Sequence, residues 1–360
     1  MINNKIFVSA GDLSGEIHAS NLVKEIKNIN PLCRISAVGG NNLKSIADDF
    51  LEDIVNIHAF GFLPIKQIVY LKKVFKKIEN HFSKDRPDKI ILVDYYGFNI
   101  YIARFAKKIN IPVYYYISPQ VWASRSGRIK KLAATVKKML VILPFEEKLY
   151  KDNGIDAVFV GNPLIDRVPE KQKIDILNPP PIIGLFPGSR KSAIKRHMPI
   201  IIETAKILKE KINAKFIIFS TTDAEFNYNL PKYIDLDISG SFEKRKTVDF
   251  AICSSGTVSL ENALMGIPMV VMYKLSYFNY FLIRAIIKIK YISIVNILAN
   301  KAIVPEFIQF DANSSKIALS VIKQLKPEKY MPKVKELLLF RDMLGIIGVS
   351  KRAAEIILND

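Results

Sequence analysis

The fold of this chain is decided first by residues 5–29, which read KIFVSAGDLSGEIHASNLVKEIKNI. Ile6–Ala10 is a short apolar run of the kind found in buried strands, and apolar side chains recur at helical spacing from Ala19 to Ile29. The small and acidic residues between them, 11–16, lack the G-x-G-x-x-G spacing of dinucleotide-binding turns. The segment therefore predicts a strand–loop–helix unit without a dinucleotide site.

The same alternation of apolar runs and helical patterns continues along all 360 residues. Strands are predicted at Ile6–Ala10, Ile90–Val93, Val113–Ile117 and Met139–Leu143, and again at Ile182–Phe186, Phe216–Ser220, Phe250–Cys253 and Met269–Met272. Strands that alternate with helices are typical of doubly wound parallel sheets. A polar stretch that ends in three prolines at 179–181 predicts an interdomain linker.

We therefore predict an α/β protein with two Rossmann-like domains. The predicted parts are an N-terminal domain over 1–168, a linker over 169–181, a C-terminal domain over 182–335 and a helical tail over 336–360. Because doubly wound domains bind ligands beyond the carboxyl ends of their strands, we expect a ligand cleft between two facing domains.

The composition favours a globular cytoplasmic protein with anionic partners. The 53 Lys and Arg residues outnumber the 34 Asp and Glu residues, and the resulting charge of +19 favours phospholipid, phosphorylated substrates or nucleic acid. Cys33 and Cys253 lie among apolar residues, as reduced buried thiols do. We expect no export signal before the first strand, and no spanning helix at 277–298, because three basic residues interrupt that apolar stretch.

Two loops of the first domain are candidates for chemistry. Asp94 follows the predicted strand Ile90–Val93, where a carboxylate can act as a general base. The alternative is that Asp94 only orders the turn, and Asn99 is a rival as the cap of the next helix. The loop after the first strand offers amides to an anionic or hydroxylated ligand, although such residues also form purely structural turns and caps. Its candidate residues are Gly11, Asp12, Ser14, Gly15 and Glu16.

Two strand-to-helix loops of the second domain have the character of phosphate sites. The loop of Gly188, Ser189 and Arg190 offers backbone amides and a guanidinium, and it lacks the Gly-Lys-Ser/Thr ending found in ATPases. The loop of Ser255, Gly256 and Thr257 is rich in hydroxyl groups. Glu261, one turn into the following helix, is placed to bind ribose hydroxyls. These features predict a nucleoside diphosphate ligand. The candidate residues of the two loops are Gly188, Ser189, Arg190, Ser255, Gly256 and Thr257.

We predict no metal ion and no cofactor. The histidines at 18, 58, 81 and 197 lack metal-ligand spacing, and we expect them at the surface or at helix caps. Positive helix ends and Arg190 can neutralise a bound diphosphate without a metal ion, and we expect no Asp-x-Asp metal motif in the chain.

Eight motifs in sequence order resemble those of the lipid-A-disaccharide synthases, which are inverting sugar-nucleotide glycosyltransferases of the two-domain GT-B fold. They are AGDLSGE at 10–16, SPQVWASR at 118–125, LPFE at 143–146, FVGNPL at 159–164, LFPGSR at 185–190, SGTVSLE at 255–261, NILA at 296–299 and VPEFIQ at 304–309. The first motif has its two acids exchanged relative to the family, Ser124 replaces a usual tryptophan, and Ala193 stands where glutamate is common. These departures leave the roles of Asp12 and Glu16 open.

The resemblance implies an activity and its partners. The family joins a UDP-2,3-diacylglucosamine donor to a 2,3-diacylglucosamine 1-phosphate acceptor, releases UDP and forms the β-1,6-linked disaccharide of lipid A. The resemblance thus implies two anionic lipid substrates, no nucleic acid partner, and a peripheral position on the inner face of the cytoplasmic membrane. It leaves open whether the chain forms a homo-oligomer. The rival functions are a non-hydrolysing UDP-sugar epimerase and a non-enzymatic module that binds lipid and nucleotide.

The resemblance also distributes roles among residues. Asp94 is the expected base, with Asp12 or Glu16 as alternatives, and Arg190 with the amides near Gly188 and Gly256 is the expected diphosphate clamp. Further substrate-binding positions are Gln120, Trp122 and Arg125 in the first domain and Asn296, Glu306 and Gln309 in the second, with Trp122 nearly as well explained by packing.

The segment Phe60–Phe82 is the expected membrane contact. Helical spacing places Ile68, Leu71, Val74, Phe75, Ile78 and Phe82 on a core face and lysines on the other side. Four apolar residues, Phe62, Leu63, Ile65 and Val69, lie among or just before those lysines, as an interfacial helix requires. The alternative is an ordinary surface helix, with the basic apolar stretch at 277–292 as the next candidate contact.

Overall fold

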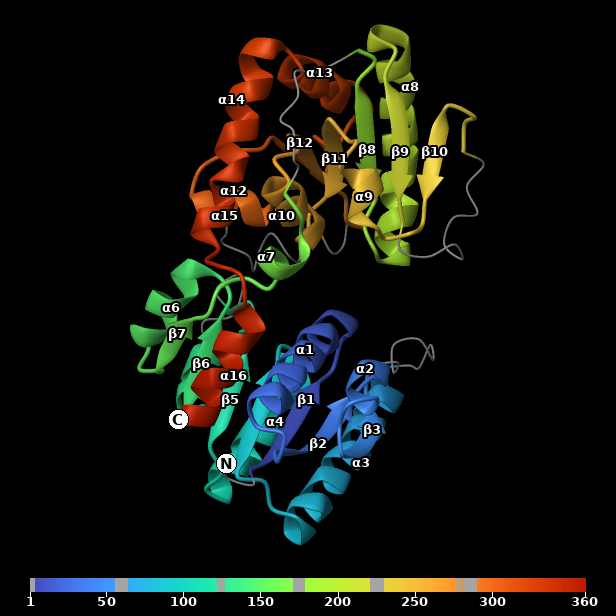
Figure 1. Ribbon diagram of the computed structural model, residues 1–360. Coiled ribbons are helices and arrows are strands. Elements are labelled where there is room, and N and C mark those ends of the chain that lie inside the picture. The colour runs from blue at the N-terminus through green and yellow to red at the C-terminus, as the bar shows by residue number, and fades with distance from the viewer. Residues whose placement is uncertain are drawn as a thin grey trace. The chain divides into compact units, whose positions relative to one another are not determined.

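The computed structural model describes residues 4–55, 64–121, 127–170, 179–220, 230–276, 280 and 290–360. The chain divides into two compact units, shown in Figure 1: unit one comprises Met1–Asp166 and Leu344–Asp360, and unit two comprises Arg167–Met343. Each unit contains a parallel sheet with helices packed on it, which confirms the predicted α/β class. Residues 171–178 of the predicted linker lie outside the described residues.

Unit one has a seven-stranded sheet in the order β3-β2-β1-β4-β5-β6-β7. Its strands are β1 (Lys5–Ala10), β2 (Arg34–Gly39), β3 (Asp49–Asp53), β4 (Lys89–Val93), β5 (Val113–Tyr116), β6 (Lys138–Val141) and β7 (Ala157–Phe159). Its helices are α1 (Leu13–Ile29), α2 (Asn41–Lys44), α3 (Pro64–Lys84), α4 (Tyr96–Lys108), α5 (Gly127–Ala133), α6 (Pro144–Lys151) and α16 (Val349–Asn359), and α7 (Leu164–Arg167) leads into unit two.

Both faces of this sheet are buried, which explains the unbroken apolar runs of its central strands. Alternate side chains of a strand point to opposite faces. Ile90 and Leu92 accordingly join one core cluster with α3, α4 and α5, whereas Ile91 and Val93 join a second cluster with α1 and α16. Each central strand therefore contributes to two cores.

The end of the chain returns to unit one. Helix α16 packs along α1, and Figure 1 shows the red C-terminal helix beside the blue N-terminal elements. The Asp166 carboxylate accepts hydrogen bonds from the backbone N–H groups of Gly348 and Val349, and the Lys89 ammonium donates to the Ile357 carbonyl oxygen at 2.6 Å. Residues 344–360 thus complete the core of unit one.

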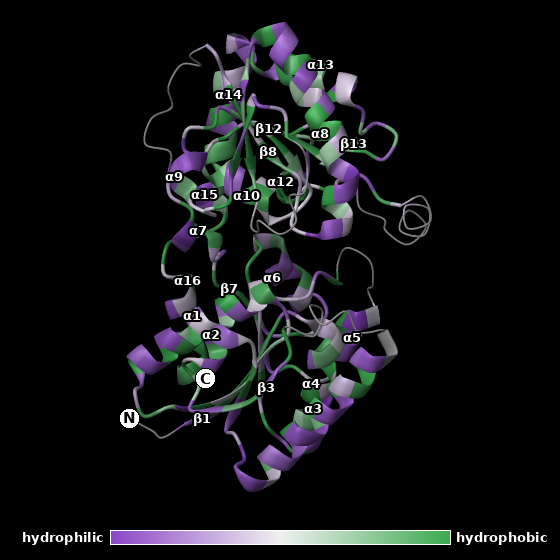
Figure 2. Cartoon of the chain, turned by 90° about the vertical axis from the view of Figure 1, so that its right-hand side faces the viewer, coloured by the Kyte–Doolittle hydropathy of each residue, from purple (hydrophilic) through white to green (hydrophobic). Residues whose placement is uncertain are grey.

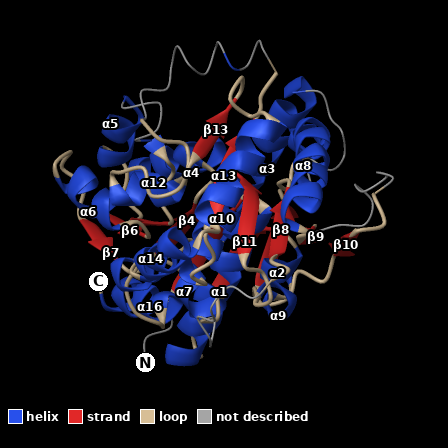
Figure 3. Ribbon diagram, turned by 90° about the horizontal axis from the view of Figure 1, so that it is seen from above, coloured by secondary structure: helices blue, strands red, loops and turns tan. Residues whose placement is uncertain are grey.

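Unit two has a six-stranded sheet in the order β10-β9-β8-β11-β12-β13. Its strands are β8 (Ile182–Phe186), β9 (Lys215–Phe219), β10 (Ile234–Asp237), β11 (Phe250–Ser254), β12 (Met269–Tyr273) and β13 (Glu306–Ile308). Its helices are α8 (Lys191–Ile212), α9 (Phe242–Arg245), α10 (Thr257–Leu264), α12 (Ile294–Ala299), α13 (Ser314–Gln324), α14 (Pro327–Leu338) and α15 (Phe340–Met343). Helices α8 and α13 pack together over one core cluster, as Figure 3 shows from above.

The strand order of each sheet reverses at one point, between β1 and β4 in unit one and between β8 and β11 in unit two. The chain leaves these neighbouring strands toward opposite faces, so a crevice opens beyond their carboxyl ends. The register pairs Ala10 with Val93 and Phe186 with Cys253. The loops that begin at Gly11, Asp94 and Pro187 therefore start at these reversal points.

Helix α3 differs from its predicted pattern at one position. Val74, Ile78 and Phe82 are buried as expected, but Ile68 is 55% exposed, so its assignment to the core face is wrong. Ile68 instead lies beside the exposed Val69, and Figure 2 shows hydrophilic and hydrophobic residues mixed along this helix. Phe62 and Leu63 lie outside the described residues, and the side chain of Ile65 is likewise not described.

Glu16 connects the first two helices of unit one. Helix α1 begins at Leu13, so Glu16 belongs to its first turn and not to a loop as predicted. The buried carboxylate accepts the backbone N–H of Asn42 at 2.6 Å and that of Leu43 at 3.1 Å, which caps α2. A Cβ atom at Gly40 would lie 2.8 Å from the carboxyl carbon of Glu16, so a larger residue there would displace the carboxylate.

We predict that Glu16→Ala lowers the free energy of unfolding by about 1–3 kcal/mol, because the buried Leu43 amide and the partly buried Asn42 amide lose their acceptor. Urea unfolding followed by circular dichroism measures the change. Glu25→Ala, at a partly exposed position of the same helix, is the matched control and should have a much smaller effect. An equal loss in both variants would show that the cap contributes little.

Candidate active site

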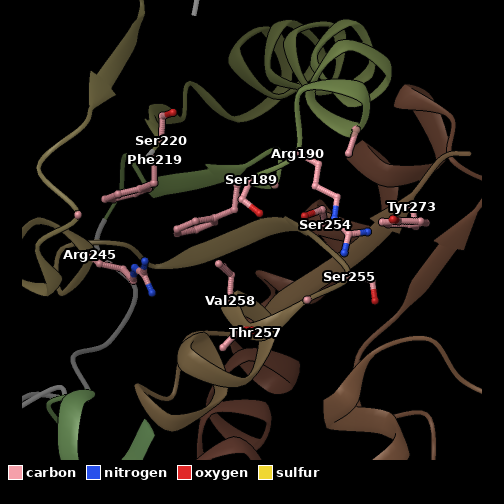
Figure 4. A pocket seen from close by; sticks show the side chains of 15 residues that line it. Ser189, Arg190, Phe219, Ser220, Arg245, Ser254, Ser255, Thr257, Val258 and Tyr273 are labelled. Atoms are coloured by element: carbon pink, nitrogen blue, oxygen red, sulfur yellow. The ribbon is translucent and has the colours of Figure 1, made fainter. Parts of the chain in front are cut away.

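A pocket of about 430 Å³ lies at the carboxyl ends of the strands of unit two. Its walls come from the loops that follow β8, β9, β11 and β12 and from α9, and Figure 4 shows their side chains. The lining residues are Phe186, Gly188, Ser189, Arg190, Ala193, Phe219, Ser220, Gly240, Arg245, Ser254, Ser255, Gly256, Thr257, Val258 and Tyr273. All six residues predicted for the two phosphate loops lie in this one pocket.

The loop after β8 presents a guanidinium and the start of helix α8 to the pocket. Gly188 has φ +106°, and a Cβ atom there would lie 2.9 Å from the Ser254 hydroxyl, so glycine is required on both counts. Arg190 is exposed at the start of α8, and within the described part of the chain its guanidinium has no hydrogen bond or ion pair. The first N–H groups of α8 receive no side-chain cap from Arg190.

The loop after β11 supplies a second helix start. Helix α10 begins at Thr257 after Gly256, which gives no side-chain cap, and a Cβ atom at Gly256 would meet open space. The Ser255 hydroxyl donates to the Ile292 carbonyl oxygen at 2.8 Å and fixes the loop. Two helix N-termini thus begin at one pocket, and the dipole of each favours an anion.

His197 connects two walls of this pocket. Its imidazole is fully buried, contrary to the expected surface or capping position. Because Nε2 accepts the Lys274 backbone N–H at 3.1 Å, Nδ1 carries the proton and donates to the Pro187 carbonyl oxygen at 2.8 Å. Burial lowers the pKa of His197, which keeps the ring neutral. The histidine thereby holds the loop after β8 to the end of β12.

Glu261 does not line the pocket. It is buried, and its carboxylate forms an ion pair with Arg245 at 2.6 Å and a longer one with Arg167 at 3.6 Å. Arg245 does line the pocket, although no sequence motif indicated it. Arg245 lies on the short helix α9 and is held by its contact with Glu261, 16 residues further along the chain. The spacing of apolar residues in the sequence does not reveal such a contact.

The other predicted donor-side residues form an internal network. The Asn296 side chain donates to Val304 and Glu306 and accepts from the backbone of residues 303 and 304. The Glu306 carboxylate also accepts the N–H groups of residues 292 and 293, and the buried Gln309 side chain bonds both backbone groups of Leu275. These side chains hold the loops near β12 and β13, and direct contact with a ligand stays a prediction.

In unit one, Asp94 lies in a strained turn at the reversal point. Asp94 and Tyr95 both have left-handed backbones, with φ values of 45° and 43°. The Asp94 carbonyl oxygen accepts from the Asn99 amide at 2.9 Å and from the Tyr115 hydroxyl. Asn99 is buried within α4 and does not cap it. Several partners therefore hold the main chain that carries the Asp94 carboxylate.

The surroundings of Asp94 make its carboxylate more basic. Burial, together with the negative charge of the neighbouring Asp12, raises the pKa of Asp94 from 3.8 to about 6. Asp12 itself caps α1, since one carboxylate oxygen accepts the Gly15 N–H at 2.7 Å. Gly11 is required because a Cβ atom would lie 2.0 Å from the Tyr95 ring. A group with a pKa near 6 is suited to general base catalysis at neutral pH.

The remaining predicted positions of unit one are less informative. Ser14 and Gln120 are exposed, and Trp122 and Arg125 lie outside the described residues. Asp235 and Asp237 have the Asp-x-Asp spacing of some metal motifs, so the expectation that the chain lacks this motif is wrong. Asp237 is buried and caps the N–H of Ser239. Within the described ranges, no group of three or more His, Cys, Asp or Glu side chains is arranged to hold a metal ion.

The architecture defines the class of protein. The fold is similar to a UDP-GlcNAc 2-epimerase from Neisseria meningitidis bound to UDP-GlcNAc, with a TM-score of 0.65 and 12% identity over 99% of this chain and 100% of that chain. It is also similar to MurG of Acinetobacter baumannii, with a TM-score of 0.62 and 13% identity over 99% of this chain and 100% of that chain. The predicted GT-B fold is confirmed.

Sequence comparison then defines the family. Residues 6–354 match the family described as Lipid-A-disaccharide synthetase. The chain is 35% identical over 371 residues to the lipid-A-disaccharide synthase of Syntrophus aciditrophicus, covering 98% of this chain and 97% of that relative. It is 37% identical over 335 residues to lipid-A-disaccharide synthase 1 of Legionella pneumophila strain Paris, covering 88% and 86%. The chain belongs to the lipid-A-disaccharide synthase family.

We predict that Asp94→Asn stabilises the fold at pH 8 and that this gain disappears toward pH 4. The native pKa of about 6 exceeds the ordinary 3.8, so the native state binds the proton more tightly than the unfolded state. The carboxylate therefore costs stability as the pH rises from about 4 to about 6, on the order of 2–3 kcal/mol in total. Thermal unfolding at several pH values measures this effect.

Asp152→Asn, at an exposed carboxylate of unit one, is the control and should show no gain of this size. A pH-independent difference at Asp94 would contradict its raised pKa.

Proposed function

We propose that this chain joins UDP-2,3-diacylglucosamine to 2,3-diacylglucosamine 1-phosphate, forming the β-1,6-linked lipid A disaccharide and releasing UDP. Its family membership supports this activity. The observation that carries the donor assignment is the pocket of unit two, where Arg190 and two open helix starts converge. That combination suits a diphosphate, since charge-assisted bonds and helix dipoles both favour anions.

In the proposed reaction, the 6-hydroxyl oxygen of the acceptor attacks C1 of the donor sugar from the face opposite the diphosphate. The bond from C1 to the diphosphate oxygen breaks with inversion, and the hydroxyl proton passes to the Asp94 carboxylate. Arg190 and the N–H groups at the starts of α8 and α10 stabilise the negative charge that develops on UDP. Asp94 fits the base because it is largely ionised at neutral pH yet more basic than an ordinary aspartate.

The two rival functions are less well supported. The structural likeness to UDP-GlcNAc 2-epimerases lies at 12% identity and concerns the fold alone. A non-enzymatic binding module gives no reason for a basic carboxylate held in a strained turn.

Measurement of UDP release with and without the lipid acceptor tests the proposal. We expect release only when both lipids are present, and we expect Asp94→Asn to lower turnover by about 10²–10⁴ while UDP affinity stays unchanged. Circular dichroism confirms that the variant is folded. Acceptor-independent UDP release, or isomerisation of the donor sugar, would instead favour the epimerase, and normal turnover of the variant would exclude Asp94 as the base.

We further propose that α3 contacts the cytoplasmic face of an anionic membrane, where both lipid substrates reside. None of the helices in the described ranges has the length and apolar character to span a bilayer. Ile68 and Val69 are 55% and 49% exposed, and the lysines at 66, 72 and 73 nearby are also exposed. Apolar groups among lysines anchor a helix in the interface, and each lysine adds about 1 kcal/mol near anionic lipid.

We predict that serine at Phe62, Leu63, Ile65, Ile68 and Val69 weakens co-sedimentation with anionic vesicles without unfolding the protein. The control replaces two exposed apolar residues of unit two, Leu319 and Leu339, with serine. It should pellet like the parent at equal ionic strength. If the α3 variant also pellets like the parent, α3 is not the contact, and residues 277–292 become the next candidate.

A further inference from the structure

Arg245 is a buried cation with most of its hydrogen-bonding capacity unused. It is 8% exposed, and a guanidinium carries five N–H donors. Within the described residues its one hydrogen bond runs from Nη1 to Glu261, and its buried Nε has no partner. Burying charged donors without acceptors is costly, so such a group points to an acceptor that arrives with a ligand.

Aromatic rings hold this guanidinium in the wall of the pocket. Its central carbon lies 5.1 Å from the ring centre of Phe186, 5.9 Å from that of Phe219 and 4.9 Å from that of Phe242. Phe186 and Phe219 are themselves stacked, with ring centres 4.8 Å apart and planes within 6°, and both line the pocket. The guanidinium thus lies over aromatic rings in the wall of the pocket.

The pocket therefore has two chemically different ends. Figure 4 shows Arg190 on one side and Arg245 on the other, with Ser189 between them. The Arg190 side has the two helix starts and suits phosphate groups. The Arg245 side has aromatic rings and suits a planar base.

We propose that Arg245 recognises the nucleobase of the donor and selects a pyrimidine with a carbonyl oxygen at position 4. This proposal rests on the proposed binding of a nucleoside diphosphate in the pocket. With the diphosphate at Arg190, the base edge farthest from the ribose reaches the Arg245 side. Uracil carries the acceptor O4 at that edge, whereas cytosine carries an amino group whose hydrogens oppose those of the guanidinium.

The ion pair with Glu261 also fixes the guanidinium in one orientation. Glu261 itself is buried and does not line the pocket, so in this structure its role toward Arg245 is to orient it. Arg245→Met alone would leave Glu261 charged and paired only with the more distant Arg167, which threatens folding.

The test compares Glu261→Gln with the double variant Glu261→Gln/Arg245→Met, since both lack the buried carboxylate charge. Calorimetry measures the affinities for UDP, CDP and pyrophosphate, and circular dichroism confirms folding. We expect the wild type and Glu261→Gln to prefer UDP over CDP by about tenfold to a hundredfold, the range of one charged hydrogen bond. In the double variant the preference should fall toward one, with pyrophosphate affinity unchanged.

Arg245→Lys keeps a positive charge beside Glu261 and guards against a double variant that fails to fold. Its preference for UDP should also fall, because an ammonium lacks the planar fork of the guanidinium. An unchanged UDP-to-CDP ratio in these variants, or no preference in the wild type, would overturn the role of Arg245. If the wild type binds neither UDP nor pyrophosphate, the proposed donor pocket fails instead, and the two failures are distinguishable.

Discussion

The reversal of strand order within each parallel sheet is the constraint on which the rest of this structure depends. All strands of a sheet run the same way, so the residues that follow them gather at one edge, and the reversal opens a crevice there. In unit one this places Asp94 next to the loop that begins at Gly11, and in unit two it places the loop of Arg190 next to that of Gly256. The candidate base and the candidate anion site follow from the same topological rule.

Strain and burial are concentrated at the reversal point of unit one. The left-handed turn at Asp94 and Tyr95 is tolerated because Gly11 leaves room for the Tyr95 ring and because Asn99 and Tyr115 hold the Asp94 carbonyl. The same packing removes water from the carboxylate and raises the pKa of Asp94. The strained turn and the buried carboxylate thus lower stability locally and make Asp94 more basic, a combination that is common at functional sites.

The features that could be predicted from the sequence are those that depend on residues close together in the chain. Apolar runs located the central strands, and strand-to-helix turns indicated the loops that meet in the pocket. Short strands such as β10 and β13 were not predicted because they lack a long apolar run. The packing of α16 against α1 was not predicted because it depends on a contact between the two ends of the chain. Arg245 and His197 were missed for the same reason, since only tertiary packing brings them to the pocket walls. Ile68 matched the helical period of α3 yet lies outside its covered face.

In the proposed reaction Asp94 is a base whose ionisation controls the rate, and the pH dependence of kcat/KM tests this most directly. With both lipid substrates supplied in mixed micelles, kcat/KM should rise with pH through an apparent pKa near 6, which is the value that burial and Asp12 give the carboxyl group. The residual activity of Asp94→Asn should lack this rise. A rise near pH 6 that persists in the variant, or a wild-type profile that is flat from about pH 5 to 8, would contradict the central claim.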